Sequence, residues 1–152
     1  MYISTKTWGH EVGLSAAFRQ WRAESHCRFI HGYALSIRVE FEAKELDYRN
    51  WVVDFGSLKS FKGMLENQFD HKTIVAEDDP ELETFQDLDR KGLIQLRVLP
   101  KVGCEAFAEY VCGAADVWLR DNGYYGRVHV RLVEVKEHGA NSAIYKTEKP
   151  EA

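Results

Sequence analysis

Apolar and polar residues alternate most regularly between residues 33 and 42 of the chain. Every odd position from Tyr33 to Phe41 is apolar, and the even positions from Ser36 to Glu42 are polar. Successive side chains of a β-strand point to opposite faces of a sheet, so this alternation predicts a strand of an antiparallel sheet with one face in the core. A weaker alternation over residues 10–18 predicts an earlier strand.

Apolar residues recur at helical spacing in two other stretches. The first covers residues 55–65 and follows Asp54, a residue suited to cap the start of a helix. The second runs from about residue 103 to residue 119, and the sequence Asp121-Asn122-Gly123 then ends it. These two stretches predict two long helices.

Two final strands are predicted at residues 127–137 and 142–146. The full order is then β, β, α, (α, β), α, β, β, which is typical of an α+β fold with two long helices on one face of an antiparallel sheet. The 152 residues fit one domain, expected to span residues 1–152. Residues 76–99 are expected to be an acidic insertion, with a solvated surface helix near its start.

Composition and charge exclude several classes of partner. With 20 basic and 24 acidic residues the net charge is −4, which gives no overall attraction for nucleic acid or anionic lipid, so neither is expected as a partner. The apolar runs are shorter than the ~18 residues that cross a bilayer, and the first ten residues do not resemble a signal peptide. Three cysteines without a closely spaced pair indicate free thiols and a cytoplasmic location.

The predicted loop at residues 19–30 carries the first group that a purely structural chain would not need. The thiol of Cys27 is flanked by Arg22, His26 and Arg28. Positive neighbours favour the thiolate, which can act as a base or a nucleophile. For this residue taken alone, a buried and inert cysteine is the alternative.

Two further segments carry carboxylates that could take part in chemistry. Asp70 precedes His71, and a carboxylate beside an imidazole can tune it for proton relay, although such pairs are also common on surfaces. Glu137 ends the strand predicted at residues 127–137, where it can accept two parallel N–H bonds from the edge of a flat heterocycle. The alternative for Glu137 is an ordinary solvated glutamate.

In their order and context these segments resemble the family of 6-pyruvoyl-tetrahydropterin synthases and 6-carboxy-tetrahydropterin synthases. The resemblance extends from Leu14 to Tyr145 and is carried by five ordered matches. They are Leu14-Ser15-Ala16-Ala17-Phe18 for the opening strand, Cys27 with His31-Gly32 for the Cys-x3-His-Gly-His motif, Val52-Val53-Asp54-Phe55 with Leu58-Lys59, Phe69-Asp70-His71 for Leu-Asp-His, and Glu137 with Ala143 and Tyr145 for the terminal segment.

The resemblance implies a fold and a reaction. The fold would be the tunnelling fold, or T-fold, whose subunits join edge to edge as trimers, stack as hexamers and place their sites at subunit interfaces. The substrate would be 7,8-dihydroneopterin triphosphate, and the enzyme a lyase. The three-residue spacing from Cys27 to His31 resembles the bacterial 6-carboxy-tetrahydropterin synthases of 7-deazaguanine (queuosine) synthesis.

The resemblance also implies roles for single residues. Glu137 would anchor the pterin ring, and Cys27 would transfer a proton on the side chain with Asp70 and His71 as relay partners. Glu105 would be a substrate-binding residue retained from the family's Pro-Thr-x-Glu helix start.

Charge alone adds three candidates for binding the triphosphate of the substrate. They are Arg19, Arg22 and Arg28, which all lie in or beside the loop that carries the thiol.

Zinc is the point at which the chain departs from the family. The family binds zinc through three histidines, and the corresponding residues here are Phe18, His31 and Tyr33. Only His31 is a clear ligand, because a phenol must lose a proton with a pKa near ~10 before it binds zinc well. His26 is a better substitute than His10, which lies too far from Phe18 if the strand at residues 10–18 is straight. We expect no tightly held zinc at this position.

Two functional hypotheses follow. The first is a lyase of the 6-carboxy-tetrahydropterin synthase type, which the retained thiol, relay and anchor favour. The second is a zinc-less T-fold protein that binds a pterin or purine through Glu137 and has lost or altered its catalysis, which the replaced histidines favour.

Overall fold

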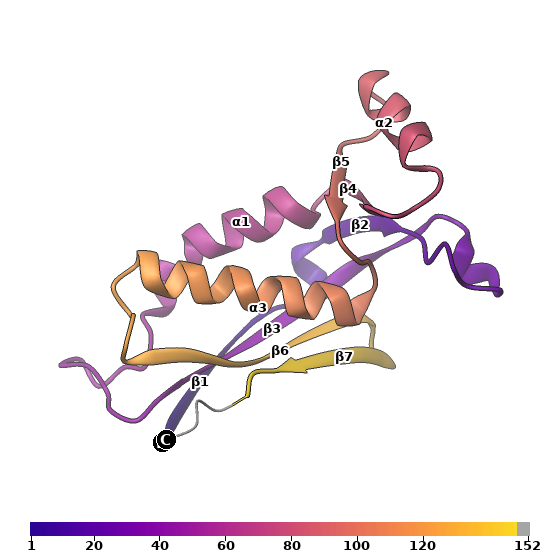
Figure 1. Ribbon diagram of the computed structural model, residues 1–152. Coiled ribbons are helices and arrows are strands. Elements are labelled where there is room, and N and C mark those ends of the chain that lie inside the picture. Colours follow the sequence, from indigo (N-terminus) through magenta and orange to yellow (C-terminus); the bar gives the residue numbers. More distant parts are fainter. Residues whose placement is uncertain (149–152) are drawn as a thin grey trace.

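The computed structural model describes residues 1–148, and their strands form one mixed sheet (Figure 1). The predicted domain end at residue 152 lies outside the described residues. The sheet has seven strands in the order β5-β4-β2-β3-β6-β7, and β1 pairs with β3. The strands are β1 (Tyr2–Trp8), β2 (Leu14–Phe18), β3 (His31–Ala43), β4 (Lys72–Ala76), β5 (Leu96–Leu99), β6 (Val128–His138) and β7 (Asn141–Lys146).

Two long helices cover one face of this sheet, and both were predicted. They are α1 (Lys59–Phe69), which follows a short 3-10 turn capped by Asp54, and α3 (Cys104–Asp121). A third helix, α2 (Leu82–Arg90), stands apart from them beside β4 and β5 (Figure 1). The predicted α+β class is therefore confirmed.

The longest strand, β3, organises the sheet because three other strands pair with it. The second half of β3 pairs with β1 on one edge and with β6 on the other, and its first half pairs with β2. Its predicted core face is confirmed, since Leu35, Ile37, Val39 and Phe41 are fully buried. The opposite face is less exposed than the alternation suggests. Glu40 is buried there between two arginines, Arg38 and Arg131.

The prediction of a purely antiparallel sheet is wrong for β4 and β5. Strand β4 pairs in parallel with β2, and β5 pairs in parallel with β4. Helices α1 and α2 carry the chain back across the sheet before β4 and β5, as parallel pairing requires. The sequence Lys72-Thr73-Ile74-Val75-Ala76 was missed as a strand because it is buried on both faces and shows no alternation.

The predicted single strand at residues 10–18 is also wrong. A 3-10 turn at His10–Val12 and the left-handed Gly13 separate β2 from the preceding strand β1, which was not predicted. The chain therefore bends at His10, whose Nδ1 lies 2.5 Å from the carbonyl oxygen of Ala34 on β3. The premise of a straight strand between His10 and Phe18 does not hold.

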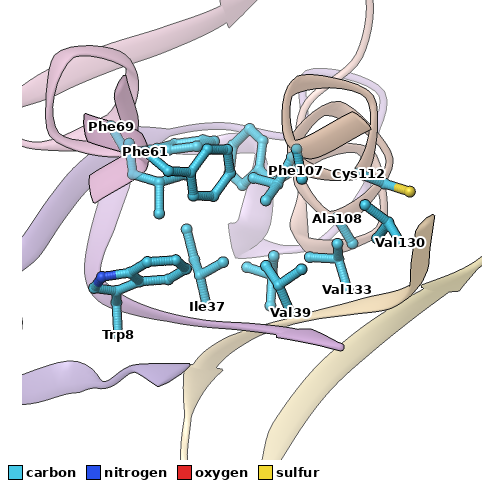
Figure 2. Packing of buried hydrophobic residues seen from close by; sticks show 14 of the residues in the cluster. Trp8, Ile37, Val39, Phe61, Phe69, Phe107, Ala108, Cys112, Val130 and Val133 are labelled. Atoms are coloured by element: carbon cyan, nitrogen blue, oxygen red, sulfur yellow. The ribbon is translucent and has the colours of Figure 1, made fainter. Parts of the chain in front are cut away.

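Aromatic rings fill the space between the two long helices and the sheet. Figure 2 shows Phe61 and Phe69 from α1 and Phe107 from α3 facing Ile37 and Trp8 across the core. The ring of Phe107 contacts that of Phe69 with 5.3 Å between the ring centres. Burial of these large side chains fixes the helices on the sheet.

The acidic insertion is held to the rest of the chain by a buried ion pair. Asp79 accepts two hydrogen bonds from the guanidinium of Arg19, at 2.9 and 2.6 Å, and its side chain is only 1% exposed. Nearby, Asp78 pairs with Arg22, and Phe85 of α2 is buried. The expectation of a wholly solvated excursion is therefore wrong at its start, although most of α2 is exposed.

The Arg19–Asp79 pair leads to a prediction about stability and pH. Burial alone would raise the pKa of Asp79, but hydrogen bonds from Arg19 and from the Glu81 N–H outweigh it and hold the pKa below its usual value. Asp79→Asn is expected to lower the free energy of unfolding at pH 7 by about 1–3 kcal/mol. A carboxylate with a lowered pKa stabilises the fold above its unfolded pKa of about 4 and loses this effect as the pH falls through the folded value.

Urea unfolding of both proteins between pH 3 and pH 7 checks this. The control is Asp87→Asn, which breaks an exposed ion pair with Arg90 on α2 and should change stability by less than about 0.5 kcal/mol. A difference between wild type and Asp79→Asn that is as large at pH 3 as at pH 7 would contradict the prediction.

None of the helices within residues 1–148 is both long and apolar enough to cross a membrane.

Candidate functional site

Three rings from β2 and β3 converge beside the start of α3. The ring centres of Phe18, His31 and Tyr33, the residues at the family's zinc positions, lie 5.4, 5.4 and 6.1 Å apart. The strand register places Phe18 opposite His31. Between the two β3 residues, Gly32 allows β2 to come close, since a Cβ at this position would lie 2.7 Å from the carbonyl oxygen of Ala16.

The rings of Phe18, His31 and Tyr33 form a triangle, called the ring triangle below. It has the spacing of a three-histidine zinc site but lacks the metal-binding nitrogen atoms. Three imidazoles on one tetrahedral zinc have ring centres roughly 5 Å apart, given zinc–nitrogen bonds of about 2.1 Å. Phe18 has no donor atom. Burial, and secondly the negative charge of Glu137, raise the pKa of Tyr33, so its phenol stays protonated and binds zinc poorly. The residues at this position therefore do not fit the metal.

Within residues 1–148 there is also no cluster of three or more His, Cys, Asp or Glu side chains arranged to hold a metal ion. The Nδ1 atom of His31 lies 2.7 Å from the carbonyl oxygen of Phe29, which orients its ring. His26, the proposed substitute ligand, begins the exposed 3-10 turn at His26–Arg28.

Glu137 lies at a break in the pairing of β6, near the thiol of Cys104. The register of β6 with β7 shifts between Lys136 and His138, which leaves Glu137 outside the ladder. Such a bulge redirects the side chain at the end of a strand. The Cys104 thiol lies near Glu137, and burial together with the Glu137 charge raises the pKa of Cys104 to about 12. The thiol therefore stays protonated beside the carboxylate.

Cys27 lies in the middle of a short turn between β2 and β3. Ser25 caps this turn, and its Oγ accepts a hydrogen bond from the Cys27 N–H at 3.4 Å. The thiol is partly exposed. The charges of Cys27 and Glu137 both act on the Tyr33 phenol, so the predicted thiol and the predicted anchor both lie in the surroundings of this ring.

Asp70 and His71 form a pair, as predicted, at the end of α1. Nδ1 of His71 lies 2.8 Å from Oδ1 of Asp70, and this carboxylate also accepts the Ser15 N–H at 3.3 Å. Burial would raise the pKa of Asp70, but the hydrogen bonds from Ser15 and His71 hold it below its usual value. The His71 side chain is 82% exposed. In the part of the chain that the structure describes, no hydrogen bond joins this pair to Cys27 or Glu137.

The three candidate arginines differ in how far other groups already hold them. Arg19 is bound by Asp79 and Arg22 by Asp78. Arg28 donates instead to the carbonyl oxygens of Glu24 and Ser25, and it lies 4.4 Å from the ring centre of Phe29. Among the ion pairs of residues 1–148, Arg28 has no carboxylate partner.

Glu105 lies exposed in the first turn of α3, as its place in the motif suggests.

Two other features of the site, Cys104 and His138, were not anticipated from the sequence. Cys104 was taken only as a free thiol, and its proximity to Glu137 brings together residues 33 positions apart in the chain. His138 was likewise not singled out, although its ring lies 6.1 Å from that of Tyr33.

Comparison with known proteins identifies relatives over almost the whole chain. A family model described as 6-pyruvoyl tetrahydropterin synthase matches residues 9–148. The chain is 27% identical over 151 residues to the 6-carboxy-5,6,7,8-tetrahydropterin synthase of Aquifex aeolicus, with 92% of each protein covered. It is 33% identical over 72 residues to the protein of the same name from Rickettsia bellii, which covers 47% of this chain and 52% of that one.

Solved structures show the same fold. An uncharacterized protein from Wolinella succinogenes matches with a TM-score of 0.79 and 23% identity, over 97% of this chain and 98% of that one. The 6-pyruvoyltetrahydropterin synthase of Plasmodium vivax matches with a TM-score of 0.62 and 15% identity, over 98% of this chain and 100% of that one. The expected T-fold of the chain is confirmed, and its assembly into trimers or hexamers stays a prediction.

Proposed function

Because the chain belongs to the 6-pyruvoyl tetrahydropterin synthase family, we propose that it is a lyase of the 6-carboxy-tetrahydropterin synthase type. Its proposed substrate is 7,8-dihydroneopterin triphosphate or a closely related pterin. The observation that carries the proposal is that both candidates lie in the surroundings of Tyr33: its ring centre is 6.1 Å from that of His138, the residue after Glu137, and the charges of Cys27 and Glu137 both act on its phenol. The proposed proton-transferring thiol and the proposed carboxylate anchor can therefore act on one substrate.

In this proposal Glu137 binds the flat edge of the pterin. The ring carries an amino group and a ring N–H side by side, and a carboxylate can accept both hydrogen bonds at once. The bulge supports this role because it frees Glu137 from the strand ladder. The protonated Cys104 thiol lies near this carboxylate.

Cys27 is the proposed base for the carbon-bound proton of the pterin side chain. Asp70 and His71 are its proposed relay partners, and Glu105 is a proposed contact of the substrate. Since the His71 ring is exposed to solvent, we propose that copies of the chain assemble as trimers or hexamers and that Asp70 and His71 of one copy serve Cys27 of another. Asp70 is ionised at neutral pH because its pKa is low, and it holds the imidazole in place.

The candidate arginines are proposed to bind the triphosphate. Arg28 is the best placed of the three candidates, because Arg19 and Arg22 are bound to aspartates of the insertion. We assign the reaction to 7-deazaguanine (queuosine) or pterin synthesis in the cytoplasm, where the free thiols of Cys27, Cys104 and Cys112 persist.

The replaced zinc ligands favour a second candidate function. In the family, zinc polarises the side-chain oxygens of the substrate and makes the neighbouring proton removable. Phe18 and Tyr33 cannot hold a metal ion for this step, and their rings fill the space that it would occupy. A T-fold protein that binds a pterin or purine through Glu137, with lost or altered catalysis, is therefore the alternative.

Release of triphosphate from 7,8-dihydroneopterin triphosphate tests the first function. Cys27→Ala is expected to lower turnover by at least about 100-fold, since proton transfer by a positioned side chain contributes about 10²- to 10⁴-fold. Cys112→Ala is the matched control, because Cys112 is a buried core thiol on α3, and it should keep wild-type turnover.

Turnover and pterin-binding measurements on the wild type, Cys27→Ala and Glu137→Gln distinguish the two functions. Absence of turnover in the wild type, with or without added zinc, would overturn the lyase. Pterin binding that Glu137→Gln weakens and Cys27→Ala leaves unchanged would then support the alternative. A wild-type chain without affinity for pterins or purines would overturn both.

A further inference from the structure

Gln20 connects the two parts of the proposed site, although nothing in the motifs points to it. It lies two residues after β2, at the start of the loop that carries Cys27. Its backbone N–H donates to the carbonyl oxygen of Cys27 at 2.9 Å, and its carbonyl oxygen accepts the Ala23 N–H at 3.0 Å. The backbone of Gln20 therefore closes the loop directly behind the thiol.

The side chain of Gln20 reaches in the other direction, to the start of α3. Its Nε2 donates to the carbonyl oxygen of Val102 at 2.9 Å, across 82 residues of sequence. The next residue, Gly103, has φ +112°, which favours glycine, and a Cβ there would lie 3.2 Å from Nε2 of Gln20. The turn before α3 is thus shaped to receive this amide.

The contact continues from α3 to the anchor. Cys104, the first residue of α3, follows Gly103 directly, and α3 packs against β6, the strand that carries Glu137. One glutamine is therefore linked through its backbone to Cys27 and through its side chain to the start of the helix that packs beside Glu137.

We infer that Gln20 is a positioning residue that fixes the distance between the thiol of Cys27 and the carboxylate of Glu137. The inference rests on the proposed function, in which Cys27 and Glu137 act on the same pterin. Gln20 touches neither of these side chains, and it acts by holding the loop and the helix start at one separation. Catalysis depends steeply on such distances, because a displacement of about 1 Å can cost about 100-fold in rate.

Gln20→Leu tests this inference, since leucine has a similar size and cannot donate to Val102. Because Gln20 is exposed, the core is unchanged by the substitution. Turnover number (kcat) is expected to fall about 10- to 100-fold, while KM and the affinity for 7,8-dihydroneopterin change less than about twofold, as Glu137 remains on β6. A purely structural role would instead lower folded protein and affect both quantities together.

A second measurement does not require activity. Iodoacetamide alkylation at pH 7.5 reports Cys27, because Cys104 and Cys112 are buried and burial raises their pKa values to about 12 and 11. Loss of the Gln20 hydrogen bond should speed alkylation of Cys27 about fivefold. The control is Gln86→Leu, which changes an exposed glutamine on α2.

The outcomes distinguish the inference from the proposed function. An active wild type with unchanged kcat and unchanged alkylation in Gln20→Leu would overturn the role of Gln20 alone. An inactive wild type would overturn the lyase, and the alkylation rate would then decide whether Gln20 holds the Cys27 loop.

Discussion

A chain that combines Phe18→His with Tyr33→His is expected to bind one zinc ion and to unfold at a higher temperature when zinc is present. The two changes complete a set of three imidazoles with His31. The present rings already lie 5.4–6.1 Å apart, which is close to the roughly 5 Å that a tetrahedral three-histidine site needs. Only the donors have to change.

The effect of zinc on this variant should be large. Phe18 is buried against the Phe107 ring, so an imidazole at position 18 leaves polar nitrogens in an apolar place and destabilises the metal-free variant by about 1–3 kcal/mol. A ligand present at 1,000 times its Kd stabilises the folded state by about 4 kcal/mol. Zinc should therefore more than reverse the loss.

Metal analysis and thermal unfolding, with and without zinc, check this prediction. The control adds His31→Ala to the same two substitutions and should bind no zinc, because two imidazoles do not make a tight site. Equal unfolding temperatures of the double variant with and without zinc would show that the triangle does not have the geometry of a metal site. Near-stoichiometric zinc on the wild-type chain would contradict our interpretation of Phe18 and Tyr33.

Phe107→Ala is expected to cost about 3–5 kcal/mol of stability, as is typical for truncating a fully buried aromatic side chain. Phe107 is completely buried, and its ring contacts Phe18 at 5.1 Å and Phe69 at 5.3 Å between ring centres. It therefore joins α3 both to α1 and to the ring triangle. For a chain of this size the loss corresponds to a fall in Tm of roughly 10 °C.

Urea and thermal unfolding measure this loss. Phe55→Ala removes an exposed phenylalanine from the turn before α1 and serves as the control, with an expected change within about 0.5 kcal/mol. A loss below about 1 kcal/mol in Phe107→Ala would mean that the core closes around the missing ring. The helices would then not depend on Phe107 for their place on the sheet.

The sequence predicted elements whose side chains follow a simple period. Strand β3 was found because one of its faces is uniformly apolar, and α3 because its apolar stripe is long and ends at Asn122 and Gly123. Strand β4 has no period because both of its faces are covered. Strand β1 was missed because two of its three less exposed positions, Ser4 and Lys6, are polar and only Trp8 is apolar.

The ring triangle could be expected from the family resemblance together with the alternation of side chains along a strand. His31 and Tyr33 share one face of a strand, and the motif order brings Phe18 beside them. The proximity of Cys104 to Glu137 could not be predicted, since a bulge at Glu137 leaves no mark in the residue pattern. The same is true of Arg19, whose partner Asp79 lies 60 residues away. A charge count gives the number of arginines but not which of them are already bound.

The close approach of β2 and β3 at Gly32 has a consequence for how such a protein can change over time. Any larger residue at this position would meet the Ala16 carbonyl and push the two strands apart. The residues on either side of it, His31 and Tyr33, carry no such restriction, since side chains alternate along β3 and theirs point to the opposite face. Evolution can thus exchange a metal-binding set for an aromatic one by side-chain replacement alone, provided that the glycine between them is retained.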